Sequence, residues 1–217
     1  ARELPCGARS VPDHLPSLLG YALSEGALSY DGHFYLYSTS TDELDDMAST
    51  LARFENTIPR REGRAAPRGS SVRPARADRG VPSSAVRFLF EECGLKGKGA
   101  LDKQVPALVD DWDLRAVSVL VAKLFQGDGC IHRRSRSIFY ATSSPGLAED
   151  VRRLLLKLGL SSTIHRKTFR YRETLRPGLT INLVGGRETY RRFEQLVGPH
   201  LVGRKRTDLA GLVADAP

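Results

Sequence analysis

The sequence predicts an α+β fold, built as a tandem pseudo-two-fold repeat of αββαββα units with two matched helices packed at the centre and antiparallel sheets beside them. Three observations support this fold class. An apolar helix that ends in an acid and a glycine occurs twice, helical and strand patterns follow each copy in the same order, and side chains in the two halves match at one fixed offset. The chain of 217 residues, 41% of them hydrophobic, is long enough to bury such a core.

The composition indicates a polyanionic partner inside the cell. Lysine and arginine together number 33 against 25 acidic residues, the formal net charge is +8 and the pI is near 9.7. Most of the basic residues are arginine, whose guanidinium suits bidentate contacts to phosphate and guanine. The cysteines, Cys6, Cys93 and Cys130, are too few and too widely spaced for a disulfide framework or a zinc site. Since no secretory signal and no bilayer-length apolar run is recognisable, we expect a cytoplasmic, intracellular protein without a membrane partner.

Residues 15–28 predict the first central helix, and residues 114–131 predict the second. Apolar residues recur in both at the spacing of one buried helix face: Leu15, Leu18, Leu19, Ala22 and Leu23, then Leu114, Val117, Val121 and Leu124. The helices end in Glu25 and Asp128, and Gly26 and Gly129 follow as helix stops because glycine readily takes φ > 0. A carboxylate at the negative end of a helix macrodipole is disfavoured unless a cation neutralises it. Each acid is therefore a candidate metal ligand.

A stripe of small residues predicts that the two helices pack closely. Ser17, Gly20 and Ser24 lie at i, i+3 and i+7, so another backbone could approach along this face. If the second helix packs there, both acids arrive side by side. An ordinary core helix whose terminal acid faces water is the alternative, and two copies of the motif at a fixed offset favour the pairing.

The other elements of the first half follow in order. Polar residues 1–14 predict a lead-in arm with little structure of its own. After the first helix we expect a turn at 31–32, a strand at 34–37, a helix at 41–54 capped by Thr41 or Asp42, a helix at 83–94 and a connector at 95–112.

The stretch 57–80 is different in kind, because it is rich in arginine, proline and glycine. Proline cannot donate in a ladder, so strands here would be edge strands or irregular. A solvated or disordered loop is one interpretation. The other is a ribbon that lies along a phosphate backbone through Arg60, Arg61, Arg64, Arg68, Arg73 and Arg76.

The second half repeats this order at an offset of 103 residues. We expect strands at 130–142 that turn near 134–135, a helix at 145–158, strands at 163–172 and 179–184, and a closing helix at 187–197. Far from the central motif, the same offset pairs Tyr37 with Tyr140, Leu51 with Leu154 and Phe90 with Phe193. A single chain with two such halves is a pseudo-symmetric reader suited to a DNA duplex.

Basic residues on the predicted strands supply the reading surface. In the strand at 163–172, strict alternation places Arg166, Arg170 and Arg172 on one face, and Arg133, Arg134 and Arg136 lie at the other hairpin. A twisted basic ribbon can enter the major groove, where arginine pairs with guanine edges. A solvated sheet face is the alternative, and the net charge together with the repeat favours DNA contact.

These motifs resemble a known family. The segments LLGYALSEG (18–26) and VAKLFQGDG (121–129) look like the two LAGLIDADG motifs of homing endonucleases, and most closely those carried by inteins. The run Lys103-Gln104-Val105-Pro106 resembles the Lys-x-Ile/Val-Pro element that precedes the second motif in that group. Residues 198–206 resemble its final glycine and basic cluster. The resemblance covers residues 13–206.

The resemblance implies a monomeric enzyme that cleaves double-stranded DNA, hydrolysing one phosphodiester in each strand of a long asymmetric site, and a saddle of basic sheets that binds it. Glu25 and Asp128 would hold Mg²⁺, with Mn²⁺ able to substitute, one acid for each strand. Lys103 would be the basic residue beside one scissile phosphate. Lys205 is our choice for the matching role, although the offset of 103 points to Arg206.

Two departures from the family pattern keep another function open. Glu25 stands where aspartate is commoner, and Lys123 occupies the position equivalent to Gly20, where it must extend outward or force the helices apart. The alternative is a catalytically weakened DNA- or RNA-binding member of the family: a nickase, a maturase or a regulator. A structural domain with a basic surface would leave the paired motifs unexplained.

The splicing residues of an intein are not recognisable in the chain. We therefore interpret it as an endonuclease domain excised from an intein, with the splicing domain as its partner in the parent protein; a free-standing enzyme is the alternative. The expected segments are an N-terminal arm (1–14), a first repeat (15–95), a connector (96–112), a second repeat (113–206) and a C-terminal tail (207–217).

Overall fold

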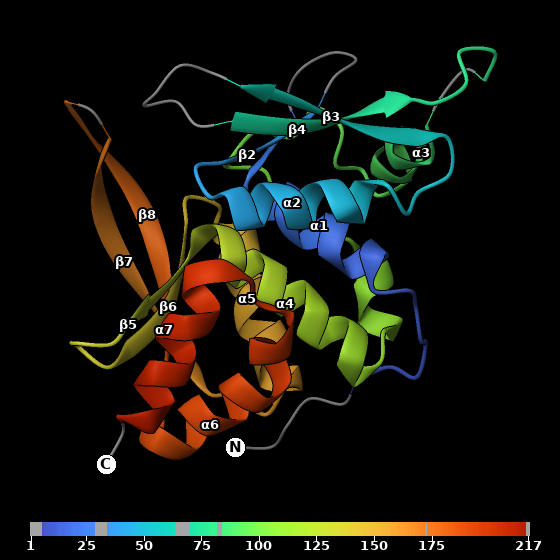
Figure 1. The fold of residues 1–217 in the computed structure, drawn as a ribbon. Helices are drawn as coiled ribbons and strands as arrows, with labels where there is room; N and C mark the ends of the chain where they lie inside the picture. The colour runs from blue at the N-terminus through green and yellow to red at the C-terminus, as the bar shows by residue number, and fades with distance from the viewer. Residues whose placement is uncertain (1–5, 29–33, 64–69, 82–83, 172, 216–217) are drawn as a thin grey trace.

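The computed structural model describes residues 6–28, 34–63, 70–81, 84–171 and 173–215. Within these ranges two units of the same element order follow each other, which confirms the predicted fold class (Figure 1). The first unit contains α1 (His14–Ser24), β1 (Gly26–Ala27), β2 (Tyr35–Ser38), α2 (Thr41–Leu51), β3 (Thr57–Gly63), β4 (Ser70–Arg76) and α3 (Ala85–Glu92). The second contains α4 (Leu114–Asp128), β5 (Gly129–His132), β6 (Ser137–Thr142), α5 (Pro145–Lys157), β7 (Ser162–Tyr171), β8 (Thr174–Leu183) and α6 (Gly186–Val197).

The two antiparallel sheets have matching strand orders, β1-β2-β4-β3 and β5-β6-β8-β7. In the described part of the arginine-rich stretch, β3 and β4 therefore pair as a ribbon, and β4 is a central strand rather than an edge strand. Its Pro74 lies opposite Pro59 of the edge strand β3, beyond the residues of β4 that pair with β2. Proline is tolerated there because no ladder hydrogen bond to β2 is lost. The predicted turn at 31–32 lies outside the described residues.

Helices α1 and α4 pack against each other at the centre of the molecule, with the first sheet above them and the second to their left in Figure 1. Leu18, Leu19 and Leu23 of α1 and Val117, Leu120, Val121 and Leu124 of α4 belong to one continuous hydrophobic core. A Cβ on Gly20 would come 2.6 Å from Cβ of Lys123 and 2.9 Å from the carbonyl oxygen of Leu120, so the glycine makes the close approach possible.

Lys123 neither extends to solvent nor separates the helices, and the sequence expectation was wrong on this point. It is 5% exposed. Its Nζ pairs with Oδ2 of Asp46 on α2 at 2.7 Å and donates to the carbonyl oxygen of His200 at 2.6 Å. Partners supplied by two other elements thus satisfy the buried ammonium, which sequence spacing along the helix cannot reveal.

The repeat contains a one-residue shift that a gapless offset misses. Gly26 pairs with Leu36 in the first sheet and Gly129 with Tyr140 in the second, so the glycines are 103 positions apart and their partners 104. Leu36, not Tyr37, is the counterpart of Tyr140. The N-caps of α2 and α5, Ser40 and Ser144, are also 104 positions apart. The cap of α2 is therefore Ser40, one residue before Thr41 and two before Asp42, the caps that were expected.

The chain does not finish with the helix that ends at Val197. A short 3₁₀ turn, η2 (Gly198–His200), leads into a further helix, α7 (Gly203–Ala214), which covers part of the segment expected to be a tail. Only Leu209 and Leu212 of α7 are buried, so its apolar pattern is weak. A second 3₁₀ turn, η1 (Ala107–Asp111), lies in the connector before α4.

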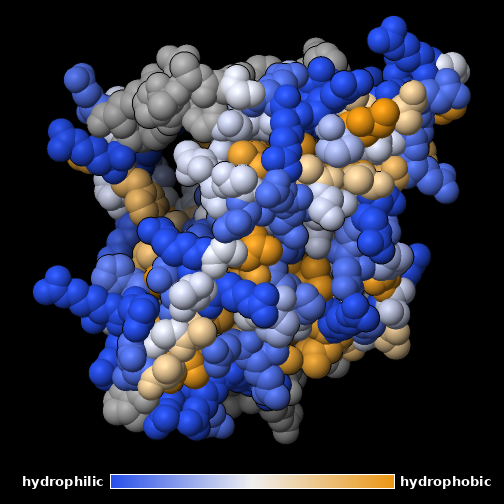
Figure 2. All heavy atoms as spheres, viewed as in Figure 1, coloured by the Kyte–Doolittle hydropathy of each residue, from blue (hydrophilic) through white to orange (hydrophobic). Residues whose placement is uncertain are grey.

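The surface on the face shown in Figure 2 is mainly hydrophilic, with hydrophobic residues in small separated groups. The cysteines Cys6, Cys93 and Cys130 are all free. Among the described residues, no helix combines the length and apolar character needed to span a bilayer.

Candidate active site

The structure brings Glu25 and Asp128 together where α1 and α4 end. Glu25 is the C-cap of α1, and Asp128 is the last residue of α4. A Cβ on Gly127 would come 2.9 Å from Cγ of Glu25, so the glutamate lies directly against the last turn of α4. The two carboxylates therefore share one site at the negative ends of two helices.

The two glycines that follow the acids are required for space rather than for positive φ. Gly129 has φ −81° and ψ 149°, which is extended backbone open to any residue. A Cβ on Gly26 would come 2.8 Å from Cα of Ala22, and one on Gly129 would come 2.6 Å from Cα of Phe125. The chain thus turns from helix to strand against the helix itself, a close approach that only glycine permits.

Lys103 reaches this site from the connector. Its side chain is buried, and its Nζ donates to the carbonyl oxygen of Gly26 at 2.8 Å. The carbonyl oxygen of Ser24 lies 3.5 Å away. The ammonium therefore caps the C-terminal end of α1 beside Glu25.

Lys205 occupies the matching position at the end of α4. Its Nζ donates to the carbonyl oxygens of Phe125, Gln126 and Gly127 at 3.0, 2.5 and 2.7 Å. It comes from the first turn of α7, the helix absent from the sequence interpretation. Lys205, rather than Arg206, thus has the contacts that Lys103 makes in the other half.

Burial and like charge raise the pKa of both acids. Desolvation is the main cause for Glu25, and Asp128 and Glu43 add to it, so that its pKa is about 7. Desolvation likewise raises the pKa of Asp128 to about 6, and the positive charges of Lys103 and Lys205 oppose this shift. The residue as a whole is nevertheless exposed to solvent. Burial lowers the pKa of both lysines, which the nearby carboxylates oppose. The four groups are one coupled cluster.

Tyr140 adds a phenol to the cluster. Its hydroxyl is fully buried and, among the described residues, makes no hydrogen bond of normal geometry. It nevertheless lies near enough to Asp128 for each group to shift the pKa of the other. Its counterpart in the first half is Leu36, so the equivalent position in the first sheet carries no hydroxyl.

Sequence reasoning missed two residues that border the site, Gln126 and Glu43. Gln126 is 1% exposed; its Nε2 donates to Oε1 of Glu43 at 2.8 Å, and its Oε1 accepts from the backbone N–H of Val202 at 2.9 Å. Gln126 interrupts an otherwise apolar helix face two residues before Asp128, and that polar residue was the available signal.

The donor set fits a hard divalent cation that also binds substrate. Among the described residues no group of three or more histidine, cysteine, aspartate or glutamate side chains could enclose a metal ion. Two neighbouring carboxylates with raised pKa values remain as the candidate ligands. Mg²⁺ commonly takes one or two protein carboxylates and completes its shell with waters and phosphate oxygens.

The sheets divide the predicted basic residues between two faces. Ladder partners share a face, so Arg166 and Arg170 lie on the side of Ile164 and the buried Ile181, which packs into the core. The opposite, open face of β7 and β8 presents His165, Lys167, Phe169 and Arg176. The strand alternation was therefore predicted correctly, but the face assigned to DNA contact is the one that continues from the core.

The same analysis separates the arginines of the first sheet. Arg61 lies opposite Val72 on the core side, where it pairs with Asp45 of α2. Arg76 lies on the core side too. Arg60 and Arg73 are ladder partners and face outward, and Nε of Arg73 donates to Oε1 of Glu62 at 2.6 Å. Arg133, Arg134 and Arg136 are exposed at the turn between β5 and β6. Arg64, Arg68 and Arg172 lie outside the described residues.

Comparison with known proteins includes a match to a family model. The family model described as a LAGLIDADG-like domain matches residues 117–198, which include the end of α4 and most of the second unit. Solved structures agree on the fold: I-DmoI in complex with DNA and Mn superposes with a TM-score of 0.59 at 14% identity, covering 87% of this chain and 98% of that one. DUF199/WhiA from Thermatoga maritima has a TM-score of 0.54 at 13% identity, and the match covers 95% of this chain and 63% of that one.

Curated relatives are much longer proteins of several kinds. The replicative DNA helicase DnaB of Rhodothermus marinus is 34% identical over 128 residues, 57% of this chain and 13% of that protein. RecA of Mycobacterium tuberculosis is 27% identical over 165 residues, which is 71% of this chain and 20% of that protein. The helicase Hel308 of Thermococcus kodakarensis is 27% identical over 214 residues, which is 89% of this chain and 18% of that protein. The chain thus matches a fifth or less of the length of each of these three relatives.

Proposed function

We propose that the chain is a LAGLIDADG homing-endonuclease-like protein, a metal-dependent endonuclease that cuts both strands of a specific DNA site. The observation that carries the proposal is the coupled cluster of Glu25, Asp128, Lys103 and Lys205 at the paired helix ends. A domain that only binds DNA has no need for two neighbouring acids whose pKa values are raised.

Each member of the cluster has a role in this proposal. A bound divalent cation, Mg²⁺ or Mn²⁺, supplies a Lewis acid that stabilises charge on the phosphate and lowers the pKa of water. Glu25 and Asp128 hold the cation by their ionised carboxylates. Lys103 donates to two helix-end carbonyl oxygens and keeps a third N–H that can face a phosphate or a water. Lys205 donates to three carbonyl oxygens, so it acts through its positive charge beside Asp128. Complexes of I-DmoI with DNA and metal support this choice of substrate and cation.

An intein origin explains why the chain resembles parts of different proteins. A segment that matches a fifth or less of DnaB, RecA and Hel308 is what an inserted mobile module would produce. We propose that this chain is such a module, that the splicing domain is its partner in the parent protein, and that it acts as a monomer in the cytoplasm. The two units already supply both halves of the site, so no second copy is needed.

The test is a selection followed by a cleavage assay. Duplexes that the protein retains from a random library in EDTA are cloned into a plasmid, which is incubated with Mg²⁺. Linear plasmid supports the proposal. Persistent retention with intact plasmid supports the catalytically weakened binder, nicked circles support a nickase, and no retention contradicts DNA recognition altogether.

A further inference from the structure

Lys103 and Lys205 are held in place by opposite halves of the molecule. Lys103 serves the end of α1, yet the segment that carries it is bound by α5 of the second unit. Lys205 serves the end of α4, and the segment before it is bound through acids of α2 in the first unit. The contacts that show this lie outside the cluster itself.

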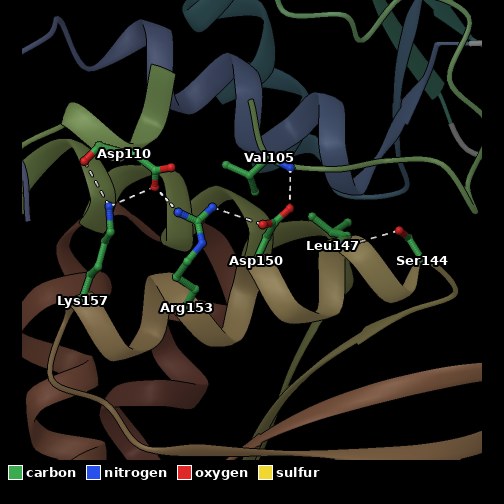
Figure 3. Close-up of polar contacts among 7 residues, drawn as sticks. All are labelled: Val105, Asp110, Ser144, Leu147, Asp150, Arg153 and Lys157. Atoms are coloured by element: carbon green, nitrogen blue, oxygen red, sulfur yellow. Dashed lines mark hydrogen bonds and ion pairs between the residues drawn. The ribbon is translucent and has the colours of Figure 1, made fainter. Parts of the chain in front are cut away.

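Helix α5 binds the backbone of the connector at successive points (Figure 3). The hydroxyl of Ser144 donates to the carbonyl oxygen of Lys103 itself at 2.7 Å, while it accepts from the N–H of Leu147 at 3.1 Å as the N-cap. Oδ2 of Asp150 accepts from the N–H of Val105 at 2.8 Å. Two backbone groups within three residues of the connector are therefore fixed by one helix.

The other side chains on this face of α5 anchor the far end of the same connector. Arg153 pairs with Oδ1 of Asp150 at 3.1 Å and also with Asp110. Nζ of the buried Lys157 donates to the carbonyl oxygen and to Oδ1 of Asp110 at 3.1 and 3.2 Å. Asp150, Arg153 and Lys157 lie at i, i+3 and i+7, so a single helix face clamps residues 103–110.

The first unit contains the mirrored arrangement. Asp46 of α2 and Asp150 of α5 are 104 positions apart, the same offset that separates the N-caps Ser40 and Ser144. Asp46 pairs with Lys123, whose Nζ donates to the carbonyl oxygen of His200, five residues before Lys205. Equivalent acids thus hold the two lysine-bearing segments, by a direct contact in one half and through a buried lysine in the other.

We propose that Asp150 and Asp46 are positioning residues, each of which holds the lysine that serves the opposite unit. This inference deepens the proposed endonuclease function and rests on it for its consequence. Because each clamp acts on a different lysine, loosening one clamp slows cleavage of one DNA strand and leaves the other strand unaffected.

The first test needs neither DNA nor metal. Folded protein is treated with an amine-acetylating reagent, and the rates at Lys103 and Lys205 are followed by peptide mass spectrometry. Asp150→Ala leaves the N–H of Val105 without its acceptor, and we expect Lys103 to react about tenfold faster while Lys205 is unchanged. Asp150→Asn retains an acceptor oxygen and restores protection.

A matched control lies one residue away. Within the described part of the chain, the ion-pair partner of Glu149 is the exposed Arg152, at 2.8 Å, and Glu149→Ala should change the reactivity of neither lysine. Asp46→Ala should expose Lys205 and not Lys103, with a thermal melt confirming that the variant is folded. Unchanged Lys103 reactivity in Asp150→Ala, or equal increases at both lysines in either alanine variant, would overturn the proposal.

The second test uses the selected plasmid and resolves the two strands. Asp150→Ala should accumulate nicked circles, with one strand cut at the normal rate and the other about tenfold slower. Equal slowing of both strands contradicts the inference. If the unaltered protein cuts nothing, the endonuclease proposal fails, whereas the acetylation result still decides the positioning of the lysines.

Discussion

At the scale of single residues, Asp128 offers the most direct test of the proposed chemistry. Asp128→Asn keeps the shape of the side chain but removes the negative charge that would hold a cation. We expect cleavage to fall by about 10²- to 10³-fold, and DNA retention to be equal or tighter because a carboxylate no longer repels phosphate. Plasmid cleavage and gel retention measure the two effects. Undiminished cleavage would remove Asp128 from the active site.

The raised pKa values of Glu25 and Asp128 predict how stability depends on pH. In the folded protein without metal their pKa values are about 7 and 6, above the usual carboxyl range. At a pH between the unfolded pKa and the folded pKa of each acid, the folded state binds more protons than the unfolded state. The free energy of unfolding therefore falls as pH rises through this range, and the loss levels off once the pH is above 7. After discounting for exposure, we expect a loss of about 1 kcal/mol between pH 6 and pH 8 in EDTA.

A cation that binds the ionised acids should reverse this trend. Mg²⁺ competes with protons, so it should raise the melting temperature more at pH 8 than at pH 6. Thermal melts with EDTA or Mg²⁺ at both pH values measure the difference. The variant with Glu25→Gln and Asp128→Asn should show neither the pH dependence nor the Mg²⁺ effect. An equal Mg²⁺ effect at both pH values would argue against binding at these carboxylates.

At the scale of elements, the central helices were predictable because period, terminal acid and glycine all agree on them. Helix α7 was not, since only Leu209 and Leu212 are buried and its first turn, Gly203-Arg204-Lys205-Arg206, has the composition of a loop. The partners of Lys123 were also out of reach, because they come from α2 and from the turn before α7. Local pattern identifies an element, whereas tertiary contacts decide which charged residues it can bury.

The packing of α1 on α4 predicts a large effect from a small substitution. Gly20→Ala places a methyl group 2.6 Å from Cβ of Lys123 and 2.9 Å from a carbonyl oxygen. The free-energy cost of this steric overlap exceeds the gain in helix propensity from alanine. We expect the melting temperature to fall by about 3–8 °C. Gly198→Ala is the control, because that glycine has φ −52° and its added Cβ would have no neighbour closer than 3.4 Å. Equal melting temperatures for the two variants would contradict the close approach.

At the scale of the whole molecule, the two halves share a fold but not an environment. Tyr140 stands beside Asp128 where Leu36 stands in the first half, and a direct contact in one clamp is replaced by a buried lysine in the other. The sequence showed the duplication but not these differences, because a single inserted residue shifts the register and changes which side chain faces the core. Alternation along β7 likewise gives two faces without saying which one continues into the core.

The two faces of each sheet predict which basic residues bind DNA. Lys167 and Arg60 lie on the open faces, and their sequence neighbours Arg166 and Arg61 lie on the core sides, so adjacent residues form matched pairs of equal charge. Lys167→Ala and Arg60→Ala should each weaken binding and reduce the slope of log affinity against log salt by about 0.9, the value for one lost phosphate contact. Arg166→Ala and Arg61→Ala should leave the slope unchanged, because both residues lie on the core sides and Arg61 already pairs with Asp45.

The slopes are obtained from DNA affinities measured between about 50 and 200 mM salt, a range in which the loss of phosphate contacts changes affinity strongly. If the core-side variants lost as much slope as the open-face variants, DNA would have to approach the sheets from their other side.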